Sequence, residues 1–136
     1  MPSRRIDVFF YGLFMDAALL RTKGVYPTDI RPASLKDFAL RIGARATLVR
    51  KRGACAYGML MELTYAEIDH LYSEKSVSAY RPEAVCAEAV DGSRVAALCF
   101  TLPEPDRKEA NPEYTSKLRD LALRLKLPPD YIEKIR

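Results

Sequence analysis

Residues 10–16, Phe-Tyr-Gly-Leu-Phe-Met-Asp, have the types and the spacing of a ligand-binding turn. They follow an apolar strand at residues 6–10 and precede a short helix, so the main-chain N–H groups of Gly12, Leu13 and Phe14 lack ladder and helix partners. Such groups can bind a carboxylate or a developing oxyanion, and glycine lets a ligand approach the backbone. An ordinary tight turn has the same pattern, so the segment alone predicts a candidate anion site and no particular reaction.

The three cysteines and the one histidine argue against metal and nucleophilic-triad chemistry. Cys55, Cys86 and Cys99 lie within predicted strands, in apolar surroundings and without CxxC spacing. We therefore expect free, buried thiols in a reducing compartment. His70 falls in a predicted helix and should be exposed. This composition leaves no basis for a structural zinc site, and little for a Ser-His-Asp or Cys-His apparatus.

The elements that must position this turn are strands in the middle of the chain and helices near its ends. The hydrophobic pattern predicts strands at residues 6–10, 34–42, 45–49, 55–63, 83–90 and 94–101, and helices at 17–23, 64–72, from 111, and at 130–135. Because the helices do not alternate with the strands, a Rossmann-like parallel sheet is excluded. The order indicates an α+β barrel or half-barrel.

Short local signals fix several boundaries. Thr64 and Glu67 form a capping box, and Asn111-Pro112 provides a cap followed by proline at the first helical position. Asp91-Gly92 predicts a hairpin, and Gly43-Ala44 and residues 51–53 (Lys-Arg-Gly) predict turns. In the last long helix Tyr114 belongs to an apolar stripe.

Length and composition suit one soluble globular domain. The chain has 136 residues, of which 49% are hydrophobic and 29% charged. No apolar run approaches the ~20 residues of a membrane span, and no secretory signal is evident, so we expect a cytoplasmic protein without membrane contact. Neither GxGxxG nor a Walker motif is present, so no nucleotide phosphate loop is expected.

The net charge of +4 comes largely from residues 36–52, which carry six basic side chains against Asp37 alone. A basic strand pair can bind nucleic acid or another polyanion. A solvated sheet face has the same composition, and Phe38 is the one aromatic residue there, so no base-stacking platform is expected. The role of this stretch stays open, and nucleic acid is not the partner we expect.

Four patterns, the first of them within the turn described above, occur in a set order: Tyr-Gly-Leu-Phe-Met at 11–15, Tyr-Gly-Met-Leu-Met-Glu-Leu at 57–63, Thr-Tyr-Ala-Glu-Ile-Asp-His-Leu at 64–71 and Ala-Tyr-Arg-Pro-Glu-Ala-Val at 79–85. Together they resemble the signature of the gamma-glutamylcyclotransferase-like family, over residues 6–102. The resemblance implies a small mixed α+β barrel with short helices and a ligand pocket at one end. We expect a single domain, residues 1–136, in which residues 103–136 are a linker and a C-terminal helical tail.

The resemblance also implies an activity. Enzymes of this family bind a γ-glutamyl group on the turn, and the substrate's own α-amine attacks its γ-carbonyl to form 5-oxoproline. A glutamate acts as general acid/base, and neither metal nor organic cofactor is needed. The substrate-binding residues implied here are Tyr11, Gly12, Leu13, Phe14 and Tyr80.

The sequence departs from the family pattern at the catalytic position. The family has Leu-Asp-x-x-Glu-Gly, whereas the residue three after Asp69 is Tyr72, and the nearest carboxylate is Glu74, followed by Lys75. Leu13 also replaces the family serine. Either Glu74 takes the catalytic role, or the base is absent; Glu83 is expected to be an exposed strand residue.

Three classes of function follow. The first is an enzyme that cyclises a γ-glutamyl amine or peptide to 5-oxoproline, with Glu74 as general acid/base. The second is a non-catalytic relative that binds a small carboxylate ligand or a protein partner. The third is a polyanion binder on the basic stretch. In the first class we expect Glu74 to point into a pocket beside Gly12 and Leu13, with burial raising its pKa.

Overall fold

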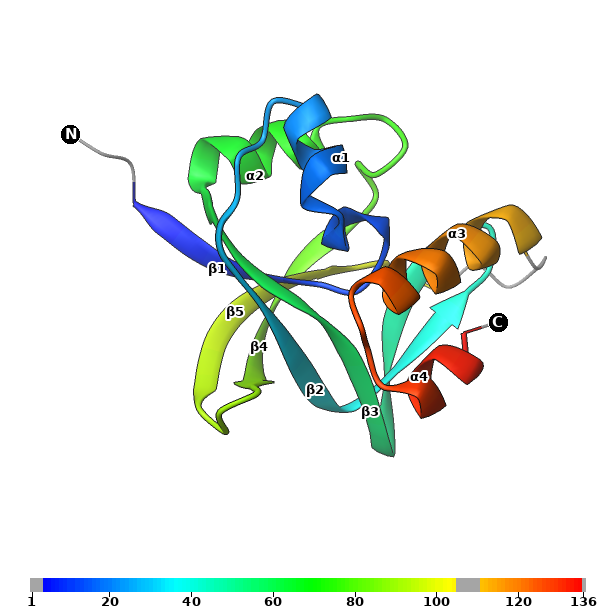
Figure 1. Cartoon of the computed structure of the whole chain (residues 1–136). Coiled ribbons are helices and arrows are strands. Elements are labelled where there is room, and N and C mark those ends of the chain that lie inside the picture. The colour runs from blue at the N-terminus through cyan, green and yellow to red at the C-terminus, as the bar shows by residue number, and fades with distance from the viewer. Residues whose placement is uncertain (1–3, 105–110, 136) are drawn as a thin grey trace.

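Five β-strands close into a barrel in the order β1-β3-β2-β4-β5 (Figure 1). The structure is a computed structural model and describes residues 4–104 and 111–135. The strands are β1 (Arg5–Phe10), β2 (Thr28–Ile42), β3 (Ala46–Thr64), β4 (Arg81–Ala89) and β5 (Arg94–Thr101). The helices are the 3-10 turn η1 (Leu13–Met15), α1 (Ala17–Thr22), α2 (Tyr65–Tyr72), α3 (Pro112–Arg124) and α4 (Pro129–Glu133). The predicted α+β barrel is confirmed.

The barrel is mixed because one of its strand pairs is parallel. β1 pairs antiparallel with β3 and parallel with β5, where Val8 lies opposite Leu98. The long β2–β3 hairpin turns at residues 43–45, as the sequence predicts, and the β4–β5 hairpin turns at Asp91-Gly92. As a result β1, which leads into the candidate turn, is hydrogen-bonded to β3 on one side and to β5 on the other.

The contact between β1 and β3 requires a glycine. A Cβ atom at Gly58 would collide with the main-chain oxygen of Phe10 and lie 2.9 Å from Cζ of Phe9. The two phenylalanines alternate in direction, so Phe9 and Phe10 pack into different hydrophobic clusters. One cluster fills the barrel, and the other lies between the barrel and the helices.

The helices begin where the local signals predict. Asp16 accepts a hydrogen bond from the N–H of Ala18 at 3.0 Å and caps α1. The capping box of Thr64 and Glu67 is complete at the start of α2. Asn111 caps α3 by accepting from the N–H of Tyr114. These caps fix the entry of each helix onto the barrel.

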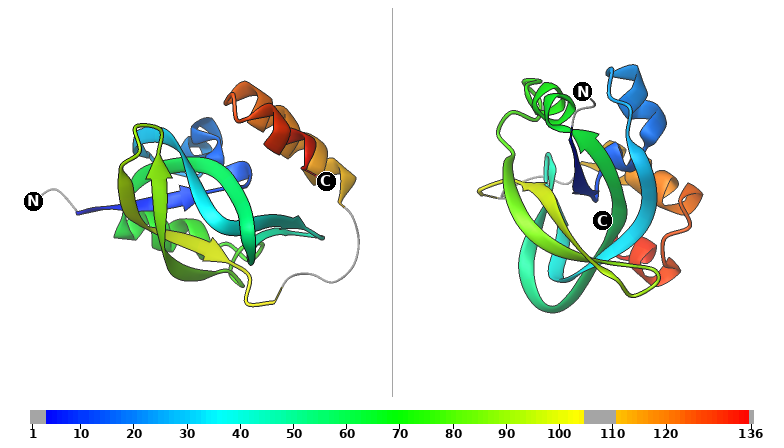
Figure 2. Two further views of the ribbon diagram at one scale, coloured as in Figure 1. Left: turned by 90° about the horizontal axis from the view of Figure 1, so that it is seen from below. Right: turned by 90° about the vertical axis from the view of Figure 1, so that its left-hand side faces the viewer.

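The helices cover one end and one side of the barrel. In Figure 1, α1 and α2 lie together at one end, while α3 and α4 lie beside the β2–β3 hairpin, and Figure 2 shows the same arrangement from two other directions. Leu118, Leu121 and Ile132 of the C-terminal segment are buried in the same cluster as Val8 and Phe10. The C-terminal helices therefore contribute to the main hydrophobic core. The predicted linker lies largely at residues 105–110, outside the described residues.

Two expectations about the strands are wrong. Residues 51–53 lie inside β3 as a bulge: the β2–β3 register shifts between Lys36 and Phe38, Gly53 has a φ of +83°, and its N–H bonds to Asp37. Glycine at positive φ occurs in bulges as well as in turns, which is why the local sequence at residues 51–53 predicted a turn. Cys86 is exposed and Cys55 half-buried, because side chains alternate along a strand and the next residues, Ala56 and Ala87, take the buried positions. Cys99 is buried, and all three thiols are free.

Across the described residues, no helix is long and apolar enough to cross a membrane.

Candidate active site

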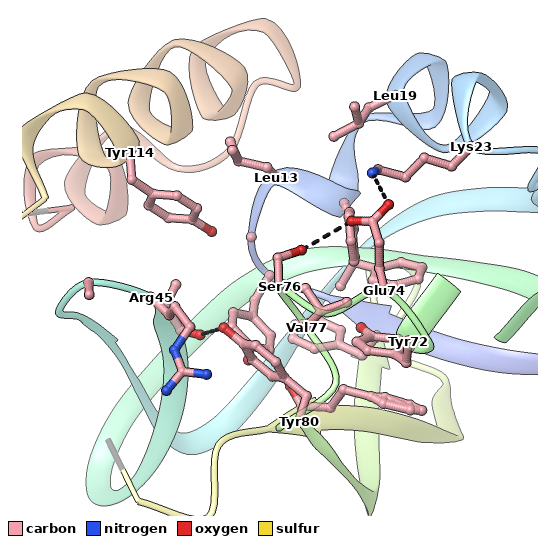
Figure 3. Close-up of a pocket in the computed structure, with 18 residues that line it drawn as sticks. Leu13, Leu19, Lys23, Arg45, Tyr72, Glu74, Ser76, Val77, Tyr80 and Tyr114 are labelled. Atoms are coloured by element: carbon pink, nitrogen blue, oxygen red, sulfur yellow. Dashed lines mark hydrogen bonds and ion pairs between the residues drawn. The ribbon is translucent and has the colours of Figure 1, made fainter. Parts of the chain in front are cut away.

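A cavity of about 350 Å³ lies between the η1 turn, the loop after α2, the β2–β3 turn and α3. Its wall contains all six residues that the sequence nominates: Tyr11, Gly12, Leu13, Phe14, Glu74 and Tyr80. They come from segments up to about 70 positions apart, which the barrel brings to one place. Eight of the 18 residues in the cavity wall are aromatic, and Figure 3 shows how the labelled side chains surround the cavity.

Aromatic packing builds the inner end of the cavity around Tyr72. Its ring stacks on Phe100, with centroids 3.8 Å apart and 14° between the planes. Phe14 meets it edge-on at 5.9 Å, and Tyr80 lies at 6.3 Å. Burial raises the pKa of Tyr72 well above its usual value, with further increases from Cys99, Tyr80 and Tyr114. The Tyr72 hydroxyl is therefore neutral at physiological pH.

Two other tyrosines use their hydroxyls to hold the barrel. Tyr11 donates to the main-chain oxygen of Phe100 at 2.6 Å, and Tyr80 donates to the main-chain oxygen of Ala46. Pro82 lies opposite Phe100 in β4 and has no N–H to offer, so Tyr11 supplies a donor that the strand partner lacks. Burial raises the pKa of Tyr11 well above its usual value.

Tyr114 reaches the candidate turn from α3. Its hydroxyl oxygen lies 2.6 Å from the position that a Cβ atom at Gly12 would occupy. Burial raises the pKa of Tyr114 to about 12. A hydrogen bond from the Leu13 main chain has the opposite and smaller effect on that pKa. Gly12 itself has a φ of −112°, outside the left-handed region. Glycine is needed here because the Tyr114 hydroxyl fills the space that a Cβ atom would occupy, and not because of the backbone conformation.

The anion cradle is partly occupied from within the protein. Met15 and Asp16 donate their N–H groups to the oxygens of Gly12 and Leu13, which forms η1. The Leu13 main chain hydrogen-bonds the Tyr114 hydroxyl. Within residues 4–104 and 111–135, no hydrogen bond engages the N–H groups of Gly12 and Phe14. Two of the three expected donors thus stay available beside the cavity.

Glu74 lies at the rim of the cavity, where it pairs with a cation. Its Oε1 is 2.9 Å from Nζ of Lys23, its Oε2 accepts from the Ser76 hydroxyl at 3.1 Å, and its side chain is 51% exposed. The hydrogen bond from Lys23 lowers the pKa of Glu74, with smaller contributions from Ser76, the Lys23 charge and His70. The expected burial and raised pKa are wrong, because α1 places an ammonium group beside the carboxylate.

The cavity is polar in different ways at its two sides. Figure 3 shows Lys23 and Glu74 facing one another on one side, and Tyr114 and Arg45 on the other. Glu83, the other carboxylate considered, lies outside the cavity wall, where it is partly buried and contacts Arg50 and Thr101. No group of three or more His, Cys, Asp or Glu side chains in the described part of the chain could hold a metal ion.

Sequence reasoning missed the contributions of Lys23, Arg45 and Tyr114 to the cavity. Tyr114 was visible only as one member of an apolar helical stripe. The Lys23–Glu74 pair joins residues 51 positions apart, and no local pattern predicts it. The sequence does show that Tyr72, and not a carboxylate, lies three residues after Asp69. In the structure the ring of Tyr72 packs against other aromatic rings.

Comparisons with solved structures show the fold. A structure described as gamma-glutamyl cyclotransferase matches with a TM-score of 0.82 and 17% identity, over 97% of this chain and 86% of the other. The structure of YkqA from Bacillus subtilis matches with a TM-score of 0.81 and 29% identity, over 96% of this chain and 52% of that one. The solution structure of At5g39720.1 from Arabidopsis thaliana matches with a TM-score of 0.66 and 20% identity, over 97% of this chain and 95% of that one.

The comparison with curated protein sequences gives no match. The model of the family described as "Gamma-glutamyl cyclotransferase, AIG2-like" matches residues 8–119, a span that contains the turn, the α2 loop and Tyr114. The chain therefore belongs to the gamma-glutamyl cyclotransferase, AIG2-like family.

Proposed function

We propose that this protein binds a γ-glutamyl amine or peptide in the cavity and cyclises its γ-glutamyl group to 5-oxoproline. One observation carries the proposal: within the described residues Glu74 is the one carboxylate in the wall of a cavity that also contains the Tyr11–Phe14 turn. Membership of the family supports the substrate class. The aromatic walls suit the apolar part of the ligand.

In the proposed reaction Glu74 accepts a proton from the substrate's α-amine, which then attacks the γ-carbonyl carbon. The new C–N bond closes the ring. The bond to the leaving amine breaks, and that amine takes the proton back from Glu74. Nucleophile and electrophile belong to one molecule, so proximity supplies much of the acceleration, and one positioned acid/base group is sufficient.

Lys23 gives the rim a second role in this proposal. In the unliganded cavity its ammonium group pairs with Glu74 and weakens the carboxylate as a base. The substrate's α-carboxylate is a competing partner for Lys23. Exchange of partners would leave Glu74 beside the α-amine with a higher pKa than in the free protein.

Product formation from a panel of γ-glutamyl amines and dipeptides tests the proposal. We expect 5-oxoproline together with the free amine in equal amounts, and we expect the same compounds to bind when chemistry is slow. Absence of 5-oxoproline from every member of the panel would contradict the enzymatic function.

A second candidate function, binding without catalysis, has an observation of its own. Tyr72 stands three residues after Asp69, where the resembling sequences have glutamate, and Glu74 is half-exposed and paired with Lys23. In that case γ-glutamyl compounds bind and are released unchanged. Calorimetric binding together with product analysis on the same samples distinguishes the two candidates.

A further inference from the structure

The four tyrosines in the cavity wall differ in what their hydroxyls do. Tyr11 and Tyr80 donate to main-chain oxygens, and Tyr114 bonds to the Leu13 main chain. The hydroxyl of Tyr72 has no hydrogen-bond partner within the described residues. Among the described residues the buried side-chain oxygen without a partner is that of Tyr131, so the Tyr72 hydroxyl reaches the open space of the cavity, where a ligand can accept from it.

The ring of Tyr72 is held in place although its hydroxyl is not. Phe100 stacks on one face of the Tyr72 ring, Phe14 meets that ring edge-on, and Tyr80 packs against it at a tilt. The ring therefore has little freedom to turn its hydroxyl elsewhere. A donor that is fixed before the ligand arrives loses little entropy on binding.

The hydroxyl also stays protonated over a wide range of pH. Burial is the largest cause of the raised pKa of Tyr72, and the charges that would form on Cys99, Tyr80 and Tyr114 raise it further. A neutral hydroxyl in a cavity with many apolar side chains is a good donor to an oxygen that carries, or develops, negative charge.

We infer that Tyr72 is a ligand-binding residue whose hydroxyl donates a hydrogen bond to the γ-acyl oxygen of the bound compound. This inference rests on the proposed function and fixes the orientation of its substrate. In this orientation the acyl oxygen lies inward at Tyr72, and the α-amine points outward to Glu74, which is the one carboxylate among the described residues of the cavity wall. During ring closure the acyl oxygen gains negative charge as nitrogen attacks the carbon, and Tyr72 stabilises that charge until the C–N bond to the leaving amine breaks.

The proposed orientation of the substrate predicts which class of compound the inner end of the cavity binds. The inner end has a hydroxyl donor and no carboxylate, so an amino group is not needed for binding there. Compounds that carry the acyl oxygen and lack the amine, such as glutarate, should bind as well as 5-oxoproline within about an order of magnitude.

The experiment compares Tyr72→Phe with the unmodified chain and with Tyr131→Phe. Tyr131 is a largely buried tyrosine of α4 that packs edge-on against Tyr57 and is not part of the cavity wall. Titration calorimetry with 5-oxo-L-proline and with glutarate gives the dissociation constants. Thermal unfolding gives the stability of each variant, and product analysis with γ-glutamyl dipeptides gives turnover.

We expect Tyr72→Phe to weaken both ligands about tenfold to a hundredfold, with an unchanged melting temperature because no internal hydrogen bond is lost. Tyr131→Phe should leave both dissociation constants unchanged. Equal affinities in Tyr72→Phe and the unmodified chain would overturn the inference and leave the proposed function standing. If the ligands bind, depend on Tyr72, and yet no 5-oxoproline forms, the inference holds and the cyclising function fails. If neither ligand binds the unmodified chain, the inference fails, and 5-oxoproline formation from the γ-glutamyl dipeptides decides the proposed function separately.

Discussion

The inner end and the rim of the cavity provide polar groups by opposite means. Inside the cavity, burial raises the pKa of Tyr72 and of Tyr114, and the ring of Phe100 stacks on that of Tyr72. At the rim, Glu74 is half-exposed, and the hydrogen bond from Lys23, 2.9 Å away, lowers its pKa. Burial thus raises the pKa of the hydroxyl donors inside the cavity, and a neighbouring cation lowers the pKa of the acid at its rim. In the proposed reaction, the inner end positions the ligand and the rim transfers the proton.

The largest effect on this division is expected from Gly12→Val. Its side chain would collide with the Tyr114 hydroxyl and displace that ring from the cavity wall. We expect binding of 5-oxoproline to weaken more than tenfold, with about 1–3 kcal/mol lost from the free energy of unfolding. Calorimetry and denaturant unfolding measure the two effects.

Gly92→Ala is the matched control for this prediction. Gly92 has a φ of +87° in the β4–β5 turn, and no atom lies within 4 Å of the added Cβ. This variant should lose some stability through backbone strain and keep its ligand affinity. A Gly12→Val variant that still bound ligand with unchanged affinity would show that the turn does not form the inner wall.

A smaller effect is expected when Tyr11→Phe is compared with Tyr72→Phe. Each change removes one hydroxyl from the same cavity wall. Tyr11 bonds to the oxygen of Phe100, whose strand partner is Pro82, so its loss leaves a buried oxygen without that donor. We expect Tyr11→Phe to cost about 1–3 kcal/mol, a fall of several degrees or more in melting temperature, and Tyr72→Phe to cost almost nothing. Equal melting temperatures in the two variants would contradict the distinction.

The smallest effect is a shift in pH dependence from Lys23→Met. A lowered pKa keeps Glu74 ionised to a more acidic pH than an isolated glutamate. Removing the ammonium group and its hydrogen bond raises the pKa of Glu74, so the acid limb of the kcat/KM profile should move to higher pH. Arg21→Met, at an exposed position of α1 outside the cavity wall, is the control and should leave the limb in place. An acid limb that stays in place in Lys23→Met would mean that Glu74 does not control it.

Much of the fold could be predicted because its signals are local. The capping box at Thr64, the Asn111-Pro112 start of α3 and the Asp91-Gly92 turn each depend on residues within a few positions of one another. The bulge at Gly53 could not be told from a turn, since the register shift that makes it a bulge involves Lys36 in the neighbouring strand.

The candidate site could be predicted in its residues and only partly in its chemistry. The turn at Gly12 and the loop at Glu74 are recognisable from sequence, and the barrel brings them to one cavity. The ion pair with Lys23 and the approach of Tyr114 depend on how α1 and α3 pack, which no spacing along the chain reveals. Those two contacts set the protonation of Glu74 and the shape of the turn.

The most direct test of the account is the rate of 5-oxoproline formation by Glu74→Gln, measured with the dissociation constant of 5-oxoproline on the same preparation. Asp69→Asn, an exposed carboxylate of α2 outside the cavity wall, is the control. The account predicts a fall in kcat of about 10²-fold or more for Glu74→Gln, with an almost unchanged dissociation constant and full activity in Asp69→Asn. Full activity in Glu74→Gln would contradict it, because the proton would then move through a group other than the carboxylate at the rim.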